Sequence, residues 1–438
     1  MPDSSKRDIK IETDPRKRLF IELLTRDISL IDCILDLIDN SVDSAVQLAK
    51  FKASAGLSKK PTKRLAKFLV SVNLSPQEFS IVDNAKGIDE ITVKEEVFRF
   101  GATNKKRNTS GLSVYGIGMK RALFKIGREI KFESKTKEER TTVNMDVDEW
   151  MGDEENWAIK GSTQKNTGKS TGTNIVVRKI NPDIARNFSS PAFQRLLIDK
   201  IAMTHGVFLH NGLRIEVNGT SVKSHMPTIA SSKRVGISSK VFTKGEVKIR
   251  IIAGLSSNDE RASDGWYVFC NGRMILEGDK SYQTGWGTND LRKFHASTGK
   301  FIGFVYFESN DVSLLPWTTT KNAVDYDSEI YQYALGHMIT IAKPIVRYLV
   351  KQFYKQKKDK KGVEAALDGA KEVSVATVGP SSLFSVKLPK NIKGNKEEIA
   401  YEVATKDISK VRKFEEDEDM PNEEIGRRTF YYFLNHQE

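Results

Sequence analysis

The stretch DLIDNSVDSA (36–45) carries three polar side chains on one side of a helical pattern. Apolar residues recur at helical spacing over about residues 20–50, which predicts one long amphipathic helix there. Asp36, Asn40 and Asp43 follow one another at i, i+4 and i+7, so they share one face of this helix. Taken alone, this pattern fits an ordinary solvated helix face better than a binding site.

Three further segments place acidic or glycine residues beside apolar runs. DNAKGI (83–88) has an acid at the end of a short β-type run, followed by a glycine turn. VYGIGMKRAL (114–123) has two glycines directly before a helical pattern, and TGT (171–173) precedes an apolar strand. Helix N-termini offer free N–H groups to phosphates, and glycine lets the backbone approach closely. Each segment alone is also explained by a plain turn. All four in this order are a much more specific signal of function.

In this order the four segments resemble the GHKL-type ATPases, the superfamily of gyrase B, the ninety-kilodalton heat-shock chaperones, histidine kinases, MutL and the MORC proteins. The resemblance covers about residues 15–350, and within the superfamily MORC and MutL are closest in pattern. FGATNKK (100–106) and YGIGMKRALFKIG (115–127) are similar to the MORC lid. CNGRMI (270–275) and LPWTTTKNAVDYDSEIY (315–331) are similar to the second domain of MutL.

The resemblance implies an α+β fold, in which a Bergerat-type two-layer α/β sandwich binds ATP and a second, transducer-like α/β domain follows. Strands before, between and after helices in the first unit agree with a sandwich. The expected division is an ATP-binding domain (1–180), a transducer-like domain (181–353), a charged linker (354–375) and a small helical tail (376–438).

The same resemblance implies a role for individual residues. Asn40 would hold Mg²⁺ through its amide oxygen, and Asp83 would accept a hydrogen bond from the adenine amino group, with Thr173 beside it. Asp36 stands where the family has the general base, and Lys321 would reach the γ-phosphate from the second domain, so that the domains close only on ATP. The other residues expected at the nucleotide are Asp43, Gly87, Ile88, Thr103, Tyr115, Gly116, Ile117, Gly118, Met119 and Lys120.

The resemblance implies a specific role in nucleotide binding for several of these residues. Gly87 would let the base approach, the backbone amides of residues 116–119 would cradle the phosphates, and Lys120 would add positive charge. Three positions depart from the family pattern. Asp36 replaces a glutamate and is one methylene shorter, so slow hydrolysis is expected. Ala85 and Ser113 replace usual glycines, but both are small enough to leave binding intact.

A competing phosphate-binding motif is rejected. TQKNTGKS (163–170) ends like a P-loop, but Thr163 stands where the first glycine should be, and a β-type run follows where a helix is required. A Gly/Lys-rich hairpin loop is expected instead. The histidines show no metal-ligand spacing with either cysteine.

The net charge of the chain indicates which class of molecule it can bind. Lys and Arg number 70 against 57 Asp and Glu, a net charge of +13 in 438 residues. Such a surplus fits a nucleic acid partner, but it also fits plain solubility. Together with the resemblance it favours an ATP-gated homodimeric clamp on duplex DNA. Two alternatives stay open: a chaperone-like or signalling ATPase that acts on a protein, and a non-hydrolysing ATP sensor. The tail after residue 376 is expected to contact a protein or to mediate dimerisation.

Composition excludes other classes of protein. A hydrophobic fraction of 39% with 22 Phe excludes wholesale disorder. Cys33 and Cys270 cannot form a disulfide framework and suggest a reducing compartment. The N-terminal segment is charged throughout, unlike a signal peptide, and the apolar stretch 333–350 is too polar for a membrane span. A cytoplasmic protein without a membrane partner is expected.

Overall fold

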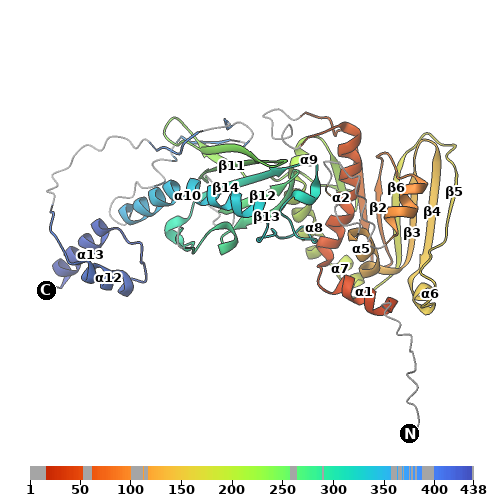
Figure 1. The fold of residues 1–438 in the computed structure, drawn as a ribbon, viewed down its shortest axis with the longest axis horizontal. Coiled ribbons are helices and arrows are strands. Elements are labelled where there is room, and N and C mark those ends of the chain that lie inside the picture. Colours follow the sequence, from red (N-terminus) through yellow and green to blue (C-terminus); the bar gives the residue numbers. More distant parts are fainter. Residues whose placement is uncertain are drawn as a thin grey trace, which may run out of the picture.

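The structure is a computed structural model, and it describes residues 16–52, 62–99, 112, 117–256, 264–288, 291–356, 363, 367, 369–373, 375, 378–379, 382–386 and 399–436. Two sheet-based units lie side by side, and a pair of short helices follows at the C-terminal end (Figure 1). The fold class is therefore the expected mixed α+β class with a second α/β unit.

The described part of the first unit is built on an eight-stranded sheet in the order β5-β4-β3-β6-β2-β1-β7-β8. Neighbouring strands pair antiparallel, except that β7 runs parallel to β1. The strands are β1 (Leu69–Leu74), β2 (Glu78–Asp83), β3 (Gly127–Lys135), β4 (Glu139–Asp146), β5 (Gly161–Lys165), β6 (Gly172–Ile180), β7 (Arg214–Val217) and β8 (Thr220–Ser221).

Helices cover the face of this sheet that is turned toward the second unit (Figure 1). Buried and less buried residues alternate along β1, as expected for a sheet with one face on the core. The first-unit helices are α1 (Lys17–Arg26), α2 (Leu30–Ala49), α4 (Glu90–Thr92), η1 (Val93–Val97), α5 (Gly118–Ile126) and α6 (Val147–Gly152). This arrangement is the two-layer sandwich that the sequence predicts.

The helix expected over residues 20–50 is in fact two helices. α1 ends at Arg26 and α2 begins at Leu30, after Ser29, whose Oγ accepts a hydrogen bond from the Asp32 N–H at 3.0 Å. A serine N-cap satisfies one of the free N–H groups of a helix start. The apolar periodicity continues across the break, so periodicity alone does not reveal it.

In the described residues of the second unit, seven strands form a sheet in the order β13-β12-β14-β11-β9-β15, with β10 paired to β11. Its helix α10 (Glu329–Gln356) packs on β11 and β14 and contains Pro344. The strands are β9 (Ile229–Ser231), β10 (Ser238–Lys244), β11 (Val247–Leu255), β12 (Gly265–Cys270), β13 (Arg273–Asp279), β14 (Phe301–Glu308) and β15 (Lys371–Val373); the short 3-10 turns are η3 (Tyr282–Thr284), η4 (Ala296–Thr298) and η5 (Val312–Leu314).

The first sheet reaches past residue 180, the boundary expected from the sequence. The Asn218–Gly219 turn joins β7 to β8, and both strands belong to the first sheet. Parallel pairing of β7 with β1 requires a crossover connection, which α7 (Pro182–Ser189), α8 (Pro191–Thr204) and α9 (Gly206–His210) supply. The sheets are thus divided after Ser221.

Two connections also differ from expectation. Strands β5 and β6 are not neighbours, so residues 166–171 form a crossing connection rather than a hairpin turn. Within the segment expected to be a linker, β15 pairs with β9. Local composition predicted a polar connection in both places, but it carries no information on which strands pair.

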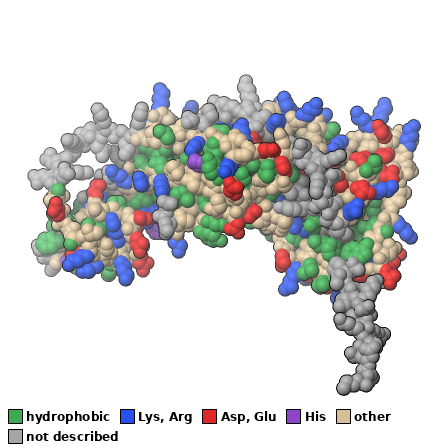
Figure 2. All heavy atoms as spheres, viewed as in Figure 1, with side chains coloured by type: hydrophobic (Ala, Val, Ile, Leu, Met, Phe, Trp, Pro, Cys, Tyr) green, Lys and Arg blue, Asp and Glu red, His purple; other side chains and the backbone are tan. Residues whose placement is uncertain are grey.

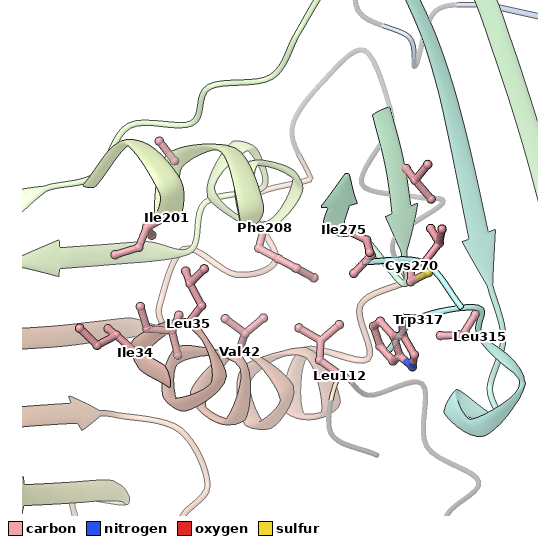
Figure 3. Close-up of a cluster of buried hydrophobic side chains, with 14 of the residues drawn as sticks. Ile34, Leu35, Val42, Leu112, Ile201, Phe208, Cys270, Ile275, Leu315 and Trp317 are labelled. Carbon is pink, nitrogen blue, oxygen red and sulfur yellow. The ribbon is translucent and has the colours of Figure 1, made fainter. Parts of the chain in front are cut away.

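A hydrophobic cluster joins the two units. Figure 3 shows Val42 on α2 with Phe208 of α9 on one side and, further along, Ile275 and Trp317 of the second unit. All four side chains are buried. α2 is therefore enclosed between its own sheet and the second unit, which explains why several of its polar residues are also buried.

The C-terminal tail forms the two helices α12 (Thr405–Phe414) and α13 (Asn422–Asn435), which lie beside the C-terminal end of α10 (Figure 1). Met420 and Ile425 are buried and belong to the same hydrophobic cluster as α10 residues. Among the helices that the structure describes, none has the length and apolar character needed to cross a membrane.

Candidate functional site

A cavity of about 580 Å³ opens between α2, the end of β2, the start of α5 and the segment before α10. This volume is within the range of small-molecule sites. Of the predicted site residues, Thr103, Tyr115 and Gly116 lie outside the described residues. The cavity is lined by the predicted residues Asp36, Asn40, Asp43, Asp83, Gly87, Ile88, Ile117, Gly118, Met119, Thr173 and Lys321.

The polar face of α2 forms one wall of the cavity, as its spacing predicts. Asp43 accepts a hydrogen bond from the Leu112 N–H. Asn40 is half-buried and lines the cavity. Its carboxamide oxygen is a hard donor of the kind that suits Mg²⁺, which binds through few protein oxygens together with substrate phosphates. The described residues contain no group of three or more His, Cys, Asp or Glu that would hold a metal by themselves.

Asp83 lies at the end of β2 in a buried position. Its Oδ2 accepts a hydrogen bond from Ser41 Oγ at 3.1 Å, and its Oδ1 accepts one from the Ala85 N–H at 2.9 Å. Burial raises the pKa of the Asp83 carboxyl, and the hydrogen bonds from Ala85, Ser41 and Thr173 offset that effect only in part. Ser41 is a residue that the sequence analysis missed, because its partner lies on another element.

Gly87 lines the cavity, and the structure gives a reason for its glycine that the sequence does not reveal. It has φ +70°, and a Cβ there would lie 2.1 Å from the Lys135 carbonyl oxygen of β3. The close approach of β3 is by itself enough to exclude a side chain here. The neighbouring Ile88 N–H donates to Ser134 Oγ at 2.6 Å, which fixes this turn against the same strand.

The N-terminus of α5 forms the opposite end of the cavity. A Cβ on Gly118 would lie 2.9 Å from Asp36 Oδ2, so glycine allows α5 to approach α2. Free N–H groups at such a helix start suit phosphate oxygens.

Lys120 does not line the cavity, contrary to expectation. Its Nζ donates to the Glu96 carbonyl oxygen at 3.4 Å. Arg121 lines the cavity instead, and its Nη2 lies 2.5 Å from Asp36 Oδ2 and 3.2 Å from the Thr319 carbonyl oxygen. Residues three apart share a helix face, so the spacing from Gly118 to Arg121 is the signal that would have identified this arginine.

A buried charged cluster is centred on Asp39, directly before Asn40. Arg273 Nε lies 3.0 and 2.9 Å from its two carboxylate oxygens, and His205 Nε2 lies 2.9 Å from Oδ1. Lys321 Nζ donates to Oδ2 at 2.8 Å. Burial alone would raise the pKa of Asp39, but Arg273 and Lys321 lower it well below its usual range. Asp39 is thus a carboxylate that ties α2 to two segments of the second unit.

Asp36 lies between two cations. Arg121 pairs with its Oδ2, and Lys321 Nζ lies 3.3 Å from its Oδ1. His205, the ring that contacts Asp39, adds no charge to this cluster, because burial lowers its pKa and keeps it neutral near pH 7. Arg121 and Lys321 are thus two buried cations that line the cavity beside Asp36, and their N–H donors suit the oxygens of a phosphate group.

Comparison with known proteins gives one match. Residues 28–175 match the family model for the histidine kinase-, DNA gyrase B-, and HSP90-like ATPases. No curated protein matches the chain. The matched range includes α2, β2 and α5, the elements that build most of the cavity, whereas Lys321 lies beyond it. By this match and by its fold, the segment 28–175 is a nucleotide-binding ATPase domain of the GHKL superfamily.

Proposed function

We propose that the chain is a Mg²⁺-dependent ATPase whose ATP-driven closure and homodimerisation form a clamp on duplex DNA, most similar to MORC and MutL and located in the cytoplasm. The observation that carries the proposal is the position of Lys321. This residue belongs to the second unit, yet it lines the cavity of the ATPase domain and contacts Asp36 and Asp39. A nucleotide in the cavity would therefore touch both units, so that its binding energy stabilises their closed arrangement.

Each end of the cavity suits one part of ATP. Asp83, held by Ser41 and Ala85, accepts a hydrogen bond from the adenine amino group. The start of α5 offers backbone N–H groups to the phosphates. Asn40 holds Mg²⁺ through its amide oxygen, and the ion would neutralise phosphate charge when bound.

Asp36 serves as the general base once its cations are redirected. Arg121 pairs with its Oδ2, and Lys321 Nζ lies 3.3 Å from its Oδ1, which accepts no hydrogen bond from the described residues. A γ-phosphate offers both cations a more highly charged partner. When the cations turn to the phosphate, a carboxylate oxygen of Asp36 becomes free to accept a proton from water. A base must lie about 2.6–3.2 Å from the proton that it removes, directly or through one water. The shorter aspartate side chain favours a water relay and slow turnover.

The same contacts favour a second candidate, a non-hydrolysing ATP sensor. If Arg121 and Lys321 keep Asp36 engaged after ATP binds, the carboxylate accepts no proton and ATP acts only by holding the units together. A third reading, a protein partner in place of DNA, is favoured by exposed aromatic side chains on α13 such as Tyr432 and Phe433. Their exposure is typical of an interaction surface.

The decisive experiment measures ATP turnover with and without duplex DNA, beside size measurements with a non-hydrolysable ATP analogue. We expect slow turnover, stimulation by DNA, and dimers that need the analogue. Asp36→Asn keeps the shape of the side chain but removes its basicity, so it should bind ATP, fail to hydrolyse it and accumulate as a dimer. Turnover that DNA leaves unchanged contradicts the DNA clamp. Equal single-turnover rates for wild type and Asp36→Asn contradict the role of Asp36.

A further inference from the structure

A second and larger cavity, of about 1350 Å³, lies between α10 and the C-terminal helices and shares no lining residue with the nucleotide cavity. One wall belongs to the second unit and carries Arg292, Lys293, Lys343, Arg347 and Lys351. The last three lie at i, i+4 and i+8, so they share one face of α10. We call these five residues the cationic wall.

The cationic wall faces an acidic segment of the tail, although Lys293, Arg347 and Lys351 are themselves exposed. Residues 415–419, with the sequence EEDED, connect α12 to the turn before α13, and we call them the acidic loop. Glu416, Asp417, Glu418 and Asp419 all line the same cavity. Basic and acidic side chains lie next to one another where the C-terminal helices meet the second unit (Figure 2). The wall and the loop are thus complementary in charge.

The pairing between loop and wall is real but incomplete. Arg292 Nη2 lies 2.7 Å from Asp417 Oδ1, and the two side chains are only 12% and 10% exposed. Arg292 Nε lies 3.9 Å from Asp419 Oδ2. Within the described residues, Arg292 Nε and Nη1 and Asp417 Oδ2 are buried without a hydrogen-bond partner. Because unsatisfied buried donors cost free energy, a ligand with more acceptor oxygens can replace the loop.

Other contacts keep the loop at the wall. Arg427 donates to the Tyr354 carbonyl oxygen, and the Arg428 guanidinium lies 5.5 Å from the centre of the Tyr354 ring. Met420, Ile425 and Tyr354 are buried and belong to one hydrophobic cluster. Because these contacts are made within one chain, the acidic loop is present at the wall at high effective concentration, and a competing ligand must overcome it.

We propose that the cationic wall binds the phosphate backbone of duplex DNA and that the acidic loop occupies it in competition with DNA. Phosphate diesters present paired oxygens that suit arginine forks, and cations repeated along one helix face suit a linear polyanion. The inference rests on the proposed function, in which duplex DNA is the cargo. Its consequence is that the tail restrains DNA binding until DNA displaces the loop.

The first test uses the full chain with Asp417→Asn/Asp419→Asn. Its matched control is Glu155→Gln/Glu246→Gln, which changes the net charge equally at exposed positions away from the wall. Affinity for a labelled duplex of arbitrary sequence is measured by fluorescence anisotropy at about 50 and 200 mM salt. We expect the loop variant to bind about tenfold more tightly, or about 1.4 kcal/mol, and the control to stay within about threefold of wild type. Adding Arg347→Ala/Lys351→Ala to the loop variant should abolish the gain.

A second measurement follows the loop itself. A zero-length carbodiimide should join lysines of the wall, such as Lys293 or Lys351, to carboxylates of the acidic loop, and saturating duplex DNA should suppress these cross-links. Equal affinity of the loop variant and its control, or cross-links that DNA leaves unchanged, overturns the competition but leaves DNA as a cargo bound elsewhere. A gain that survives Arg347→Ala/Lys351→Ala overturns the wall as the site. If no variant binds DNA at about 50 mM salt, both the inference and the DNA clamp are wrong.

Discussion

Lys321 Nζ donates a 2.8 Å hydrogen bond to Asp39 Oδ2, although 282 positions separate the two residues. Both side chains are almost fully buried. Burial would lower the pKa of Lys321, but Asp39 and Asp36 raise it, so the ammonium stays charged. The contact brings the second unit to the cavity beside α2, and the charges of this pair govern the first two predictions below.

Asp39→Asn should destabilise the protein strongly. The substitution leaves Arg273 and Lys321 buried with one charge fewer to balance them, and removal of one partner from a buried pair costs about 3–5 kcal/mol. Chemical denaturation monitored by tryptophan fluorescence measures the loss. The control is Asp148→Asn, whose carboxylate is exposed and lies 3.9 Å from Arg128; it should change stability by less than about 1 kcal/mol. Equal losses in the two variants would contradict a structural role for the buried cluster.

Lys321→Ala should retain nucleotide binding but lose most turnover and the ATP-induced dimer. The side chain lines the cavity from the second unit, and in the proposed mechanism it is the contact that couples the nucleotide to closure. Binding is measured with a fluorescent ATP analogue, turnover by phosphate release, and dimerisation by size exclusion. The control is Lys240→Ala, an exposed lysine on β10. Wild-type turnover in Lys321→Ala would refute the contact with the γ-phosphate.

Gly118→Ala should reduce turnover at least about tenfold, because its Cβ would lie 2.9 Å from Asp36 Oδ2 and displace the carboxylate from the position in which a general base must reach water. Gly336→Ala is the matched control, since a Cβ at this helical position meets no atom within 4 Å. The control should gain about 0.5–1 kcal/mol of stability, the usual effect of replacing an exposed helical glycine by alanine, and keep normal turnover. Both quantities come from a thermal melt and a turnover assay on the same preparations. Normal turnover in Gly118→Ala would show that Asp36 tolerates displacement.

The affinity for ATP should fall as the pH is lowered. The fall should begin above about pH 3.9, the ordinary pKa of an aspartate side chain. Burial raises the pKa of Asp83, so this carboxylate takes up a proton at a higher pH than usual and then loses acceptor capacity for the adenine amino group. Above the raised pKa the affinity should be constant. The comparison is calorimetric titration of wild type and Asp83→Asn across pH, because protonation of the phosphates affects both proteins equally. A parallel decline in the two proteins would show that another group titrates.

The sequence by itself determined one face of the site and two turns elsewhere in the fold. The helical repeat fixes Asp36, Asn40 and Asp43 on one face of α2, whatever packs against them. The Asn-Gly turns place Asn218 and Asn271 in the left-handed region, with φ near 47° and 46°. These features depend on backbone dihedral angles and on neighbours within a few residues, so the local sequence specifies them.

Tertiary structure alone decided which distant groups meet. The same helical repeat that turns Lys120 away from the cavity turns Arg121 into it, but the direction of the cavity depends on how α5 packs on α2. β7 joins the first sheet because a crossover returns the chain to β1. Asp39 meets Lys321, and the acidic loop meets Arg292, because hydrophobic packing brings the units together. Burial then sets the strength of these charge pairs, and no local sequence pattern encodes burial by a segment hundreds of residues away.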